Sequence, residues 1–455
     1  MSHAGKFFTS LAVQLAKTIP SLQNHICDTI VGQSDIASLS LSDQWCQLVL
    51  GPLSRLEKSH QPYVLVIDAL DECDSDINVR TILGLLAEVQ LLKTVRLRVF
   101  LTGRPEIPIR HGIHLIPQAQ RQYFILHDIS QTIVDHDINI FFRHRLKHIA
   151  DEHCLGAGWP DAQFVKHLVQ SASGLFIWAA TACRFIEEGR SLATNRLSIV
   201  LKVDSIDDFA DGFSSDDSIT DANHNDHAVA PDQHLDKLYI TVIRNSIYKY
   251  KNPERKKWRK LLGSIIVTIA VLSSPLSTQS LAKVLGTTQD QIDQILNDLH
   301  AILDIPKDTT HPLRLHHPSF RDFLLDPERC KDLRLGIGEK QAHQALVTKC
   351  IRLMSCLKKD VCGQEAPGAL IADLESCRIE QCLPLEVRYA CLYWVQHLQS
   401  SDSHAYDNKE AYQFLQAHLL HWLEALGWMG KITEGIQEIL SLEAYISVSY
   451  LSIIY

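Results

Sequence analysis

Short, nearly unbroken apolar runs that end in polar residues are the clearest pattern along the chain. Residues 63–67 read Tyr-Val-Leu-Val-Ile, and residues 97–101 read Leu-Arg-Val-Phe-Leu. A run of this length, rich in β-branched residues, is typical of a strand buried on both faces, as in a parallel sheet. A similar run at residues 123–126 predicts the next strand.

Apolar residues elsewhere recur every three to four positions, which is the spacing of a helix with one buried face. The pattern predicts helices at residues 6–18, 22–31, 41–56 with a kink at Pro52, 78–92, 130–153, 234–249, 261–272, 280–285 and 289–303, and over most of residues 336–442. Thr288 is a suitable N-cap for one of them. The chain therefore begins as an α/β protein and continues as a helical one.

Composition narrows the function classes. The chain has 455 residues, 46% of them apolar and 21% charged, which is enough for two to four domains. A net charge of −9 does not favour a nucleic-acid binder, and no apolar run is long enough to cross a membrane. The 12 cysteines form no Cys-x-x-Cys pair and the 23 histidines are dispersed. We expect reduced thiols in a cytoplasmic protein, and no metal cluster is evident in the sequence.

A cluster of carboxylates follows the first predicted strand. Asp68, Asp71 and Glu72 lie within five residues, directly after residues 63–67. The carboxyl ends of parallel strands border the crevice in which open α/β sheets bind ligands. Three carboxylates this close repel one another unless a cation lies among them. The cluster favours a metal or phosphate site, and a strand followed by a polar turn is the alternative.

An arginine follows the second predicted strand in the same way. Residues 97–101 lead into Thr102, Gly103, Arg104 and Pro105, and the glycine and proline indicate a sharp exit from the strand. Arg104 would then lie at the edge that carries the carboxylates. It is a candidate partner for a phosphate or a carboxylate, with a solvated surface arginine as the alternative.

The two segments Val-Leu-Val-Ile-Asp-Ala-Leu-Asp-Glu-Cys-Asp and Leu-Arg-Val-Phe-Leu-Thr-Gly-Arg-Pro-Glu resemble the Walker B and sensor-one segments of NACHT domains. The resemblance is to the fungal subgroup of these signal-transduction switch NTPases, the one with a nephrocystin-3-like N-terminal domain. It implies that Asp68 holds Mg²⁺, that Asp71 and Glu72 polarise the attacking water, and that Arg104 lies near the nucleotide phosphates. It also implies direct pairing of strands 63–67 and 97–101.

The phosphate-binding loop of such domains has no counterpart in the sequence. The pattern Gly-x-x-x-x-Gly-Lys-Ser/Thr occurs nowhere, and Gly5-Lys6 lacks the preceding strand, the upstream glycine and the hydroxyl. The resemblance implies that this loop and its strand precede the segment that begins here, as in a family member cut off at its start. We expect weak binding of ATP or ADP with Mg²⁺, and an exposed edge on strand 97–101 unless residues 123–126 cover it.

Two charged stretches and one aromatic segment have mainly structural interpretations. Residues 203–233 are rich in aspartate and predict an acidic disordered loop, with a calcium loop as a weaker alternative. Residues 249–260 are basic and predict a solvated helix face. Residues 173–180 resemble a packed helix of the NACHT helical subdomain, in which Phe176 and Trp178 would be core residues.

The order of helix, turn, short helix, longer helix and extended stretch over residues 261–324 predicts a winged helix. A DNA-binding role is disfavoured because the last of these helices carries Asp290, Asp293 and Asp298. His317, in His-His-Pro-Ser-Phe, resembles the family histidine that contacts the β-phosphate of ADP and holds the switch closed. A histidine that caps the start of a helix is the alternative.

These observations predict an α/β P-loop NTPase-like partial parallel sheet, an all-α helical subdomain, a winged-helix domain and a C-terminal helical region. The predicted ranges are 1–128 for the NTPase core, 129–202 for the helical subdomain, 203–233 for the acidic loop, 234–330 for the helix and winged helix, and 331–455 for linker helices. No sensor repeat follows those helices, so we expect truncation at this end as well.

The resemblance implies a nucleotide-dependent signalling switch, of a fungal self/non-self or innate-immunity type. Its partners would be further copies of this chain or full-length relatives, with neither nucleic acid nor membrane. Residual NTPase activity, a non-catalytic scaffold or decoy, and an incomplete gene model are the three hypotheses that follow.

Overall fold

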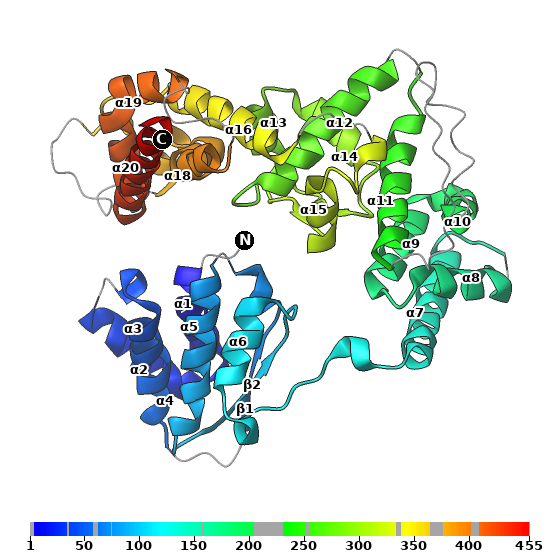
Figure 1. The fold of residues 1–455 in the computed structure, drawn as a ribbon, viewed down its shortest axis with the longest axis horizontal. Coiled ribbons are helices and arrows are strands. Elements are labelled where there is room, and N and C mark those ends of the chain that lie inside the picture. The colour runs from blue at the N-terminus through cyan, green and yellow to red at the C-terminus, as the bar shows by residue number, and fades with distance from the viewer. Residues whose placement is uncertain are drawn as a thin grey trace. The chain divides into compact units, whose positions relative to one another are not determined.

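The computed structural model describes residues 4–33, 36–57, 62–73, 75–156, 158–203, 231–251, 254–333, 338–364, 376–401 and 409–454. The chain forms two compact units, residues 1–126 and residues 127–455, each with its own apolar core (Figure 1). The predicted acidic loop and its calcium-loop alternative lie outside the described residues between 204 and 230. No helix in the described ranges has an apolar stretch that could span a bilayer.

The first unit is a pair of parallel strands packed against helices. Its elements are α1 Phe7–Thr18, α2 Pro20–Gly32, α3 Leu41–Trp45, α4 Gly51–Ser54, β1 Pro62–Ile67, α5 Asp76–Ala87, β2 Arg96–Leu101 and α6 Ile107–Leu115. β1 and β2 pair directly, with Tyr63 opposite Leu97 and Ile67 opposite Leu101. The predicted pairing is confirmed, and α5 is the crossover helix that a parallel pair requires.

Only one face of this sheet is buried. Leu65 and Ile67 of β1 are 9% and 8% exposed and belong to the core of the unit, whereas Val64 and Val66 are 60% and 64% exposed. The prediction of a strand buried on both faces is therefore wrong for one face. The cause is tertiary, because the described helices of the unit pack on the side that carries Leu65 and Ile67.

The predicted strand at residues 123–126 is absent. Residues 121–125 have no regular structure, Leu126–Asp128 is a 3₁₀ turn, and Phe124 is 82% exposed. A strand requires a neighbour that supplies backbone donors and acceptors, and in the described residues β1 and β2 pair only with each other. The apolar run therefore lacks a partner strand. The next helix has Ser130 at its N-cap position.

The helix predicted at residues 41–56 is divided. A π-helical turn, Cys46–Leu50, separates α3 from α4, so the irregularity begins before Pro52. A proline lacks an amide hydrogen and crowds the preceding turn, and the wider turn absorbs that defect. The inward face agrees with the prediction, since Trp45, Leu48 and Val49 are at most 1% exposed.

The second unit is almost entirely helical. Its elements are α7 Gln131–Glu152, α8 Ala162–Ala172, α9 Phe176–Glu188, α10 Ala193–Leu201, α11 Pro231–Tyr248, α12 Glu254–Val271, α13 Thr278–Leu285, α14 Gln289–Leu296, β3 Leu303–Asp304, β4 Arg314–Leu315, α15 Pro318–Leu325, α16 Glu339–Met354, α17 Ser376–Cys382, α18 Leu385–Gln399, α19 Lys409–Trp428 and α20 Ile432–Ile454. One continuous apolar core runs from α7 to α20. The predicted helical character of this part is confirmed.

Two aromatic residues of α9 have opposite environments. Trp178 is fully buried and meets the ring of Phe142 edge-on at 6.4 Å between centroids. Phe176 is 44% exposed, so its predicted core position is wrong. Phe176 is the first residue of the helix, and its ring reaches only the partly buried Phe141 at 6.0 Å.

The segment after α12 contains two helices and a short ladder in the predicted order, but α13 and α14 are both 8 residues long, so the longer second helix is not seen. α13 and α14 are followed by a short antiparallel ladder in which Leu303 lies opposite Leu315. Thr288 caps α14 as expected, because its hydroxyl accepts from the Gln291 amide and the Gln291 side chain accepts in return from the Thr288 amide. The helix ends at Leu296, earlier than its apolar pattern suggested.

A buried chain of polar side chains joins three elements of the second unit. The Ser273 amide donates to the Tyr389 hydroxyl at 3.2 Å, Tyr389 lies 2.7 Å from Nε2 of His397, and Nδ1 of His397 lies 2.9 Å from Nδ1 of His343. A hydroxyl can accept from the amide and donate its own hydrogen to Nε2 of His397 at the same time. His397 then donates to His343, and each position along the chain holds one hydrogen.

This arrangement leaves no place for a further proton between the two histidines. Burial, with a smaller contribution from the neighbouring His343, lowers the pKa of His397 to about 3. Burial also lowers the pKa of His343, with Glu339 acting in the opposite direction and Arg321 in the same one. A proton added to Nδ1 of His343 would place two N–H groups opposite each other, and a proton added to Nε2 of His397 would place an N–H group opposite the Tyr389 hydroxyl hydrogen, in a buried site.

The buried histidines predict that the protein loses stability in mild acid. Their folded-state pKa values lie below the ordinary value of 6.5, so the unfolded chain binds more protons as pH falls from about 6.5 to about 4. In this pH window, unfolding should therefore take up between one and two protons on these histidines, in addition to any protons taken up by other groups. Urea denaturation at several pH values measures this slope. His397→Asn should flatten the slope, whereas Leu346→Ala, a buried change on the same α16 as His343, should lower the whole curve and keep its slope.

The two phenylalanine environments give a second prediction. Phe142→Ala should lower the free energy of unfolding by about 3–5 kcal/mol, because it leaves a cavity beside Trp178. Phe176→Ala is the matched control, and it should cost less than about 1 kcal/mol. Chemical denaturation followed by tryptophan fluorescence compares the two, and equal losses would contradict the described packing.

Candidate functional site

The exits of β1 and β2 are tied together by backbone hydrogen bonds. The Thr102 amide donates to the Ile67 carbonyl at 2.9 Å, and the Leu70 amide donates to the Thr102 carbonyl at 3.0 Å. Between these bonds Ala69 takes a left-handed conformation with φ of +51°, and its amide donates to the Thr102 hydroxyl at 2.9 Å. The chain thereby turns sharply out of the sheet into the 3₁₀ turn Leu70–Glu72.

Asp68 lies exposed at this carboxyl edge, as predicted from the strand pattern. Its Oδ1 accepts a hydrogen bond from the Thr102 hydroxyl. The hydroxyl thus accepts from one residue of the β1 exit and donates to another. The sequence did not single out Thr102, although the register contains the signal: Ile67 lies opposite Leu101, so the next residue on each strand is Asp68 and Thr102.

Asp71 is held by Arg104. The Arg104 amide donates to Oδ1 of Asp71 at 3.1 Å, and Nε of Arg104 lies 3.5 Å from Oδ2. The Asp71 side chain is 9% exposed and that of Arg104 is 43% exposed. Gly103 permits this approach, since a Cβ at that position would lie 3.3 Å from Oδ1 of Asp71 and 2.9 Å from the Ile109 side chain. The predicted meeting of the acidic cluster with Arg104 therefore occurs, in the form of an ion pair.

The four predicted residues of this edge differ in what they can still bind. Asp71 is occupied by Arg104 on both oxygens, Asp68 is exposed with one oxygen on Thr102, and Glu72 is exposed at the end of its turn. An exposed carboxylate beside a hydroxyl fits Mg²⁺, which takes one or two carboxylates and keeps several waters. A triphosphate requires a nest of backbone amides and a lysine, and the sequence has no such motif. The residues present fit the metal better than the nucleotide.

His317 lies in the second unit, at the N-cap of α15. The Ser319 amide donates to its Nδ1 at 3.2 Å, and the Ser319 hydroxyl lies 2.7 Å from the same nitrogen. An amide can only donate, so Nδ1 is the acceptor and the ring hydrogen is on Nε2. The helix-capping geometry is therefore present, and it presents a hydrogen-bond donor on the other side of the ring.

A buried tyrosine supports this histidine. The Tyr239 hydroxyl of α11 lies 2.9 Å from the Ser319 hydroxyl, and Tyr239 is 1% exposed. Burial raises the pKa of Tyr239 to about 12, although the bond to Ser319 acts in the opposite direction. Since the Ser319 hydroxyl donates to His317, Tyr239 donates to Ser319. The relay fixes the tautomer of His317 from inside the core.

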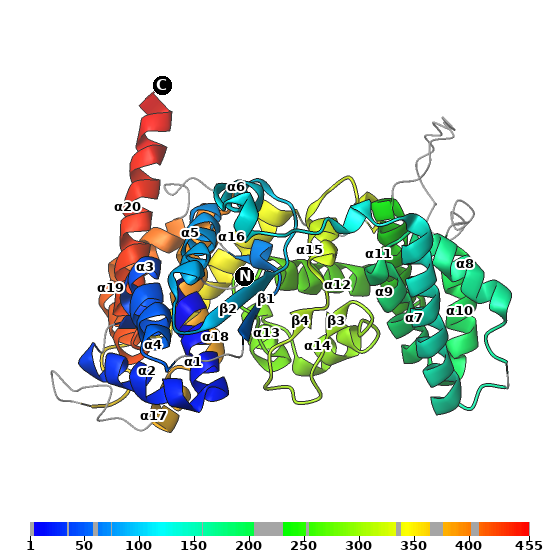
Figure 2. The ribbon, with the colours of Figure 1, turned by 90° about the horizontal axis from the view of Figure 1, so that it is seen from below.

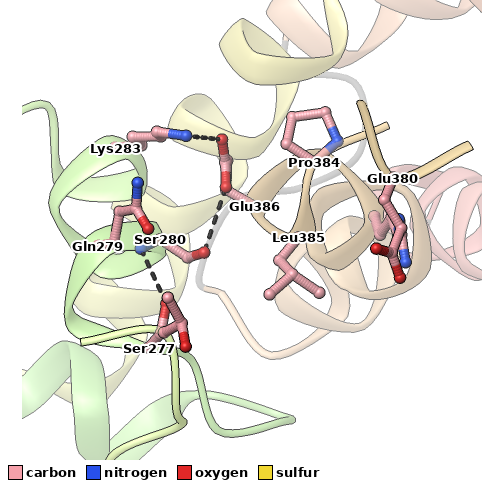
Figure 3. A pocket seen from close by; sticks show the side chains of 10 residues that line it. Ser277, Gln279, Ser280, Lys283, Glu380, Pro384, Leu385 and Glu386 are labelled. Atoms are coloured by element: carbon pink, nitrogen blue, oxygen red, sulfur yellow. Dashed lines mark hydrogen bonds and ion pairs between the residues drawn. The ribbon is translucent and has the colours of Figure 1, made fainter. Parts of the chain in front are cut away.

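A polar cavity of about 270 Å³ lies elsewhere in the second unit, between α13 and the start of α18 (Figure 3). Its buried carboxylate, Glu386, is 2.7 Å from Nζ of Lys283 and accepts from the Ser280 hydroxyl at 3.2 Å. None of the residues predicted from the sequence lines it. Because the Glu386 carboxylate already contacts the Lys283 ammonium and the Ser280 hydroxyl, its role is to link α18 to α13.

The chain is similar to one protein family and to one further known protein. The family model for the nephrocystin 3 N-terminal region matches residues 1–104. The vegetative incompatibility protein HET-E-1 of Podospora anserina is 24% identical over 411 residues, which cover 84% of this chain and 26% of the relative. Together these matches support a NACHT-like family. The chain spans about a quarter of the length of that relative.

The matched range gives the NACHT-like interpretation a specific location. Residues 1–104 contain the whole edge formed by Asp68, Asp71, Glu72 and Arg104, and they contain both strands. The site is therefore part of what the chain shares with the nephrocystin 3 N-terminal region.

The geometry predicts different costs for neighbouring carboxylates. Asp71→Ala should lower the free energy of unfolding of the first unit by about 1–3 kcal/mol, because it removes the acceptor of the Arg104 amide and the guanidinium. Glu72→Ala removes a similar charge from an exposed position and should change stability by less than about 0.5 kcal/mol. Denaturant unfolding of the two variants decides the matter, and an equal effect would show that the ion pair does not hold the edge.

Proposed function

We propose that this chain supplies the metal-side edge and the helical body of a NACHT-like signalling switch, and that it acts through contacts with other proteins more than through nucleotide turnover. The observation that carries this proposal is the state of the edge. Asp71 is satisfied by Arg104 and Asp68 by Thr102, so the carboxylates need no metal to remain close together.

The edge suggests how a polyphosphate would be sensed. Arg104 has one guanidinium and could pair either with Asp71 or with a phosphate oxygen. A phosphate at this edge would compete for Arg104, and Asp71 would lose its partner. Mg²⁺, when bound, would neutralise phosphate charge, and Asp68 is the residue that would hold it. Asp71 and Glu72 would then be able to orient water, which is the role that the resemblance implies.

The second unit would carry the remaining parts of the switch. We assign residues 129–202 to the helical subdomain, 234–330 to a winged helix and 331–455 to linker helices. The Nε2–H of His317 is a donor of the kind that a β-phosphate oxygen accepts, and Tyr239 with Ser319 keeps that tautomer in place. The described cysteines are free thiols, which supports a cytoplasmic location.

A scaffold or decoy function is the second candidate, and a specific observation favours it. Parallel sheets are normally covered on both faces, yet Val64, Val66 and Phe100 are 58–64% exposed on one face of the sheet. An apolar face of this kind suits contact with another copy of this chain or with a full-length relative. Such a function needs neither ATP nor Mg²⁺.

Nucleotide titration distinguishes the two candidates. Fluorescently labelled ATP added to the full chain with Mg²⁺ should bind weakly, and Asp68→Ala should leave this affinity unchanged within about twofold, since no lysine–glycine cradle fixes the triphosphate beside the carboxylate. The same titration without Mg²⁺ is the control. Tight binding that depends on Mg²⁺ and is lost in Asp68→Ala would establish the nucleotide-binding function and refute the scaffold.

A further inference from the structure

Three side chains of metal-ligating types, from two helices of the second unit, meet outside the candidate site described above. His148 and Glu152 lie on α7, and Glu187 lies on α9. Each offers a ligand atom, and these three atoms lie within 4.8 Å of one another. Nδ1 of His148 is 3.7 Å from Oε2 of Glu152. We propose that these side chains form a binding site for a divalent first-row transition metal, and that Zn²⁺ is the main ion it binds.

The spacing on α7 suits chelation. Residues four positions apart lie on the same face of a helix, one turn above the other, so His148 and Glu152 project side by side. Helical metal sites use this spacing for two ligands of one ion. Figures 1 and 2 both show α9 beside α7, which brings Glu187 to the same place. A site built from two helices is more rigid than a pair of ligands on one.

The backbone adds a field that attracts cations. α7 ends at Glu152 and α9 ends at Glu188, so Glu152 and Glu187 lie in the last turns of the two helices and His148 lies one turn before Glu152. The C-terminal end of a helix carries roughly half a negative charge, concentrated in that last turn. Two such ends and two carboxylates therefore converge on the three ligand atoms. This convergence is independent of the ligand types and points to the same kind of occupant.

An arginine side chain already pairs with one of the three ligands. The Arg145 guanidinium lies 2.8 Å from Oε2 of Glu187, and both side chains are about one-third exposed. A carboxylate has two oxygens with several acceptor positions, so the bond to Arg145 is compatible with a metal bond from the same group. Arg145 would hold the Glu187 carboxylate towards α7, as outer hydrogen-bond partners do for many metal ligands.

The ligand set selects the class of metal. Ca²⁺ and Mg²⁺ prefer sets made only of oxygen atoms, whereas an imidazole with carboxylates suits zinc and its neighbours. Three protein ligands leave a coordination position for water, and the exposed side chains of His148 and Glu152 allow solvent to reach it. The site therefore resembles an open zinc site more than a closed structural one.

Metal titration of the full chain, stripped with a chelator, tests the proposal. Zn²⁺ binding is measured by calorimetry, and Co²⁺ serves as the spectroscopic probe of the same site. His148→Ala should weaken binding at this site by about tenfold or more. His144→Ala is the matched control, because it removes an exposed histidine one turn earlier on α7 and should leave the affinity unchanged. Circular dichroism without metal checks that each variant is folded.

Glu187→Gln tests the two-helix nature of the site separately. It keeps the shape of the side chain and should also weaken Zn²⁺ binding by about tenfold. Equal affinities of the wild type and His148→Ala, or full affinity in Glu187→Gln, would overturn the proposal. A sulfur-to-cobalt charge-transfer band that survives in both variants would place the metal on cysteines and would overturn it as well.

Discussion

The pairing of Asp71 with Arg104 is the contact around which the edge of the first unit is organised. Each residue follows a different strand, so their bond fixes the two strand exits relative to each other. Thr102 adds a second tie, since its amide, carbonyl and hydroxyl contact four successive positions at the β1 exit, residues 67–70. These protein groups offset part of the mutual repulsion among the carboxylates.

The pairing of these carboxylates with protein groups affects what each of them can do. A carboxylate that is nearly buried and bonded through both oxygens is poorly suited to orient water. An exposed carboxylate beside a hydroxyl remains suited to a hydrated cation. The two carboxylates therefore differ: Asp68 is exposed, whereas Asp71, to which the resemblance gives a water-polarising role, is paired with Arg104.

The second unit relies on buried polar links as well as on its apolar core. The relay from Ser273 through Tyr389 to the two histidines joins the turn after α12 to α16 and α18, and Glu386 joins α18 to α13. Such links are satisfied only in one arrangement of the helices, so they select that arrangement over others of similar apolar burial. The same principle applies at His317, where the core residue Tyr239 sets the hydrogen-bonding state of a partly exposed ring.

Local pattern was sufficient where the physics is local. The positions of most helices, the N-cap at Thr288 and the acidic edge after residue 67 all depend on neighbours within a few residues, and the sequence predicted them. Pattern failed where an element needs a distant partner. Residues 123–126 have the composition of a strand, but in the described residues no strand lies beside them. Phe176 is a residue type typical of cores, but it is the first residue of its helix and is exposed.

The sequence by itself determined an α/β beginning, a helical continuation and a set of charged groups at the ends of two strands, because periodicity and turn chemistry are written in adjacent residues. Only the tertiary structure decided which charges meet. Asp71 pairs with Arg104, Asp68 accepts a hydrogen bond from Thr102, and Glu187 lies beside His148. In each case the packing of segments far apart in the chain brings the two residues together. A charge selects its partner by distance in space, and that distance exists only after the elements have packed.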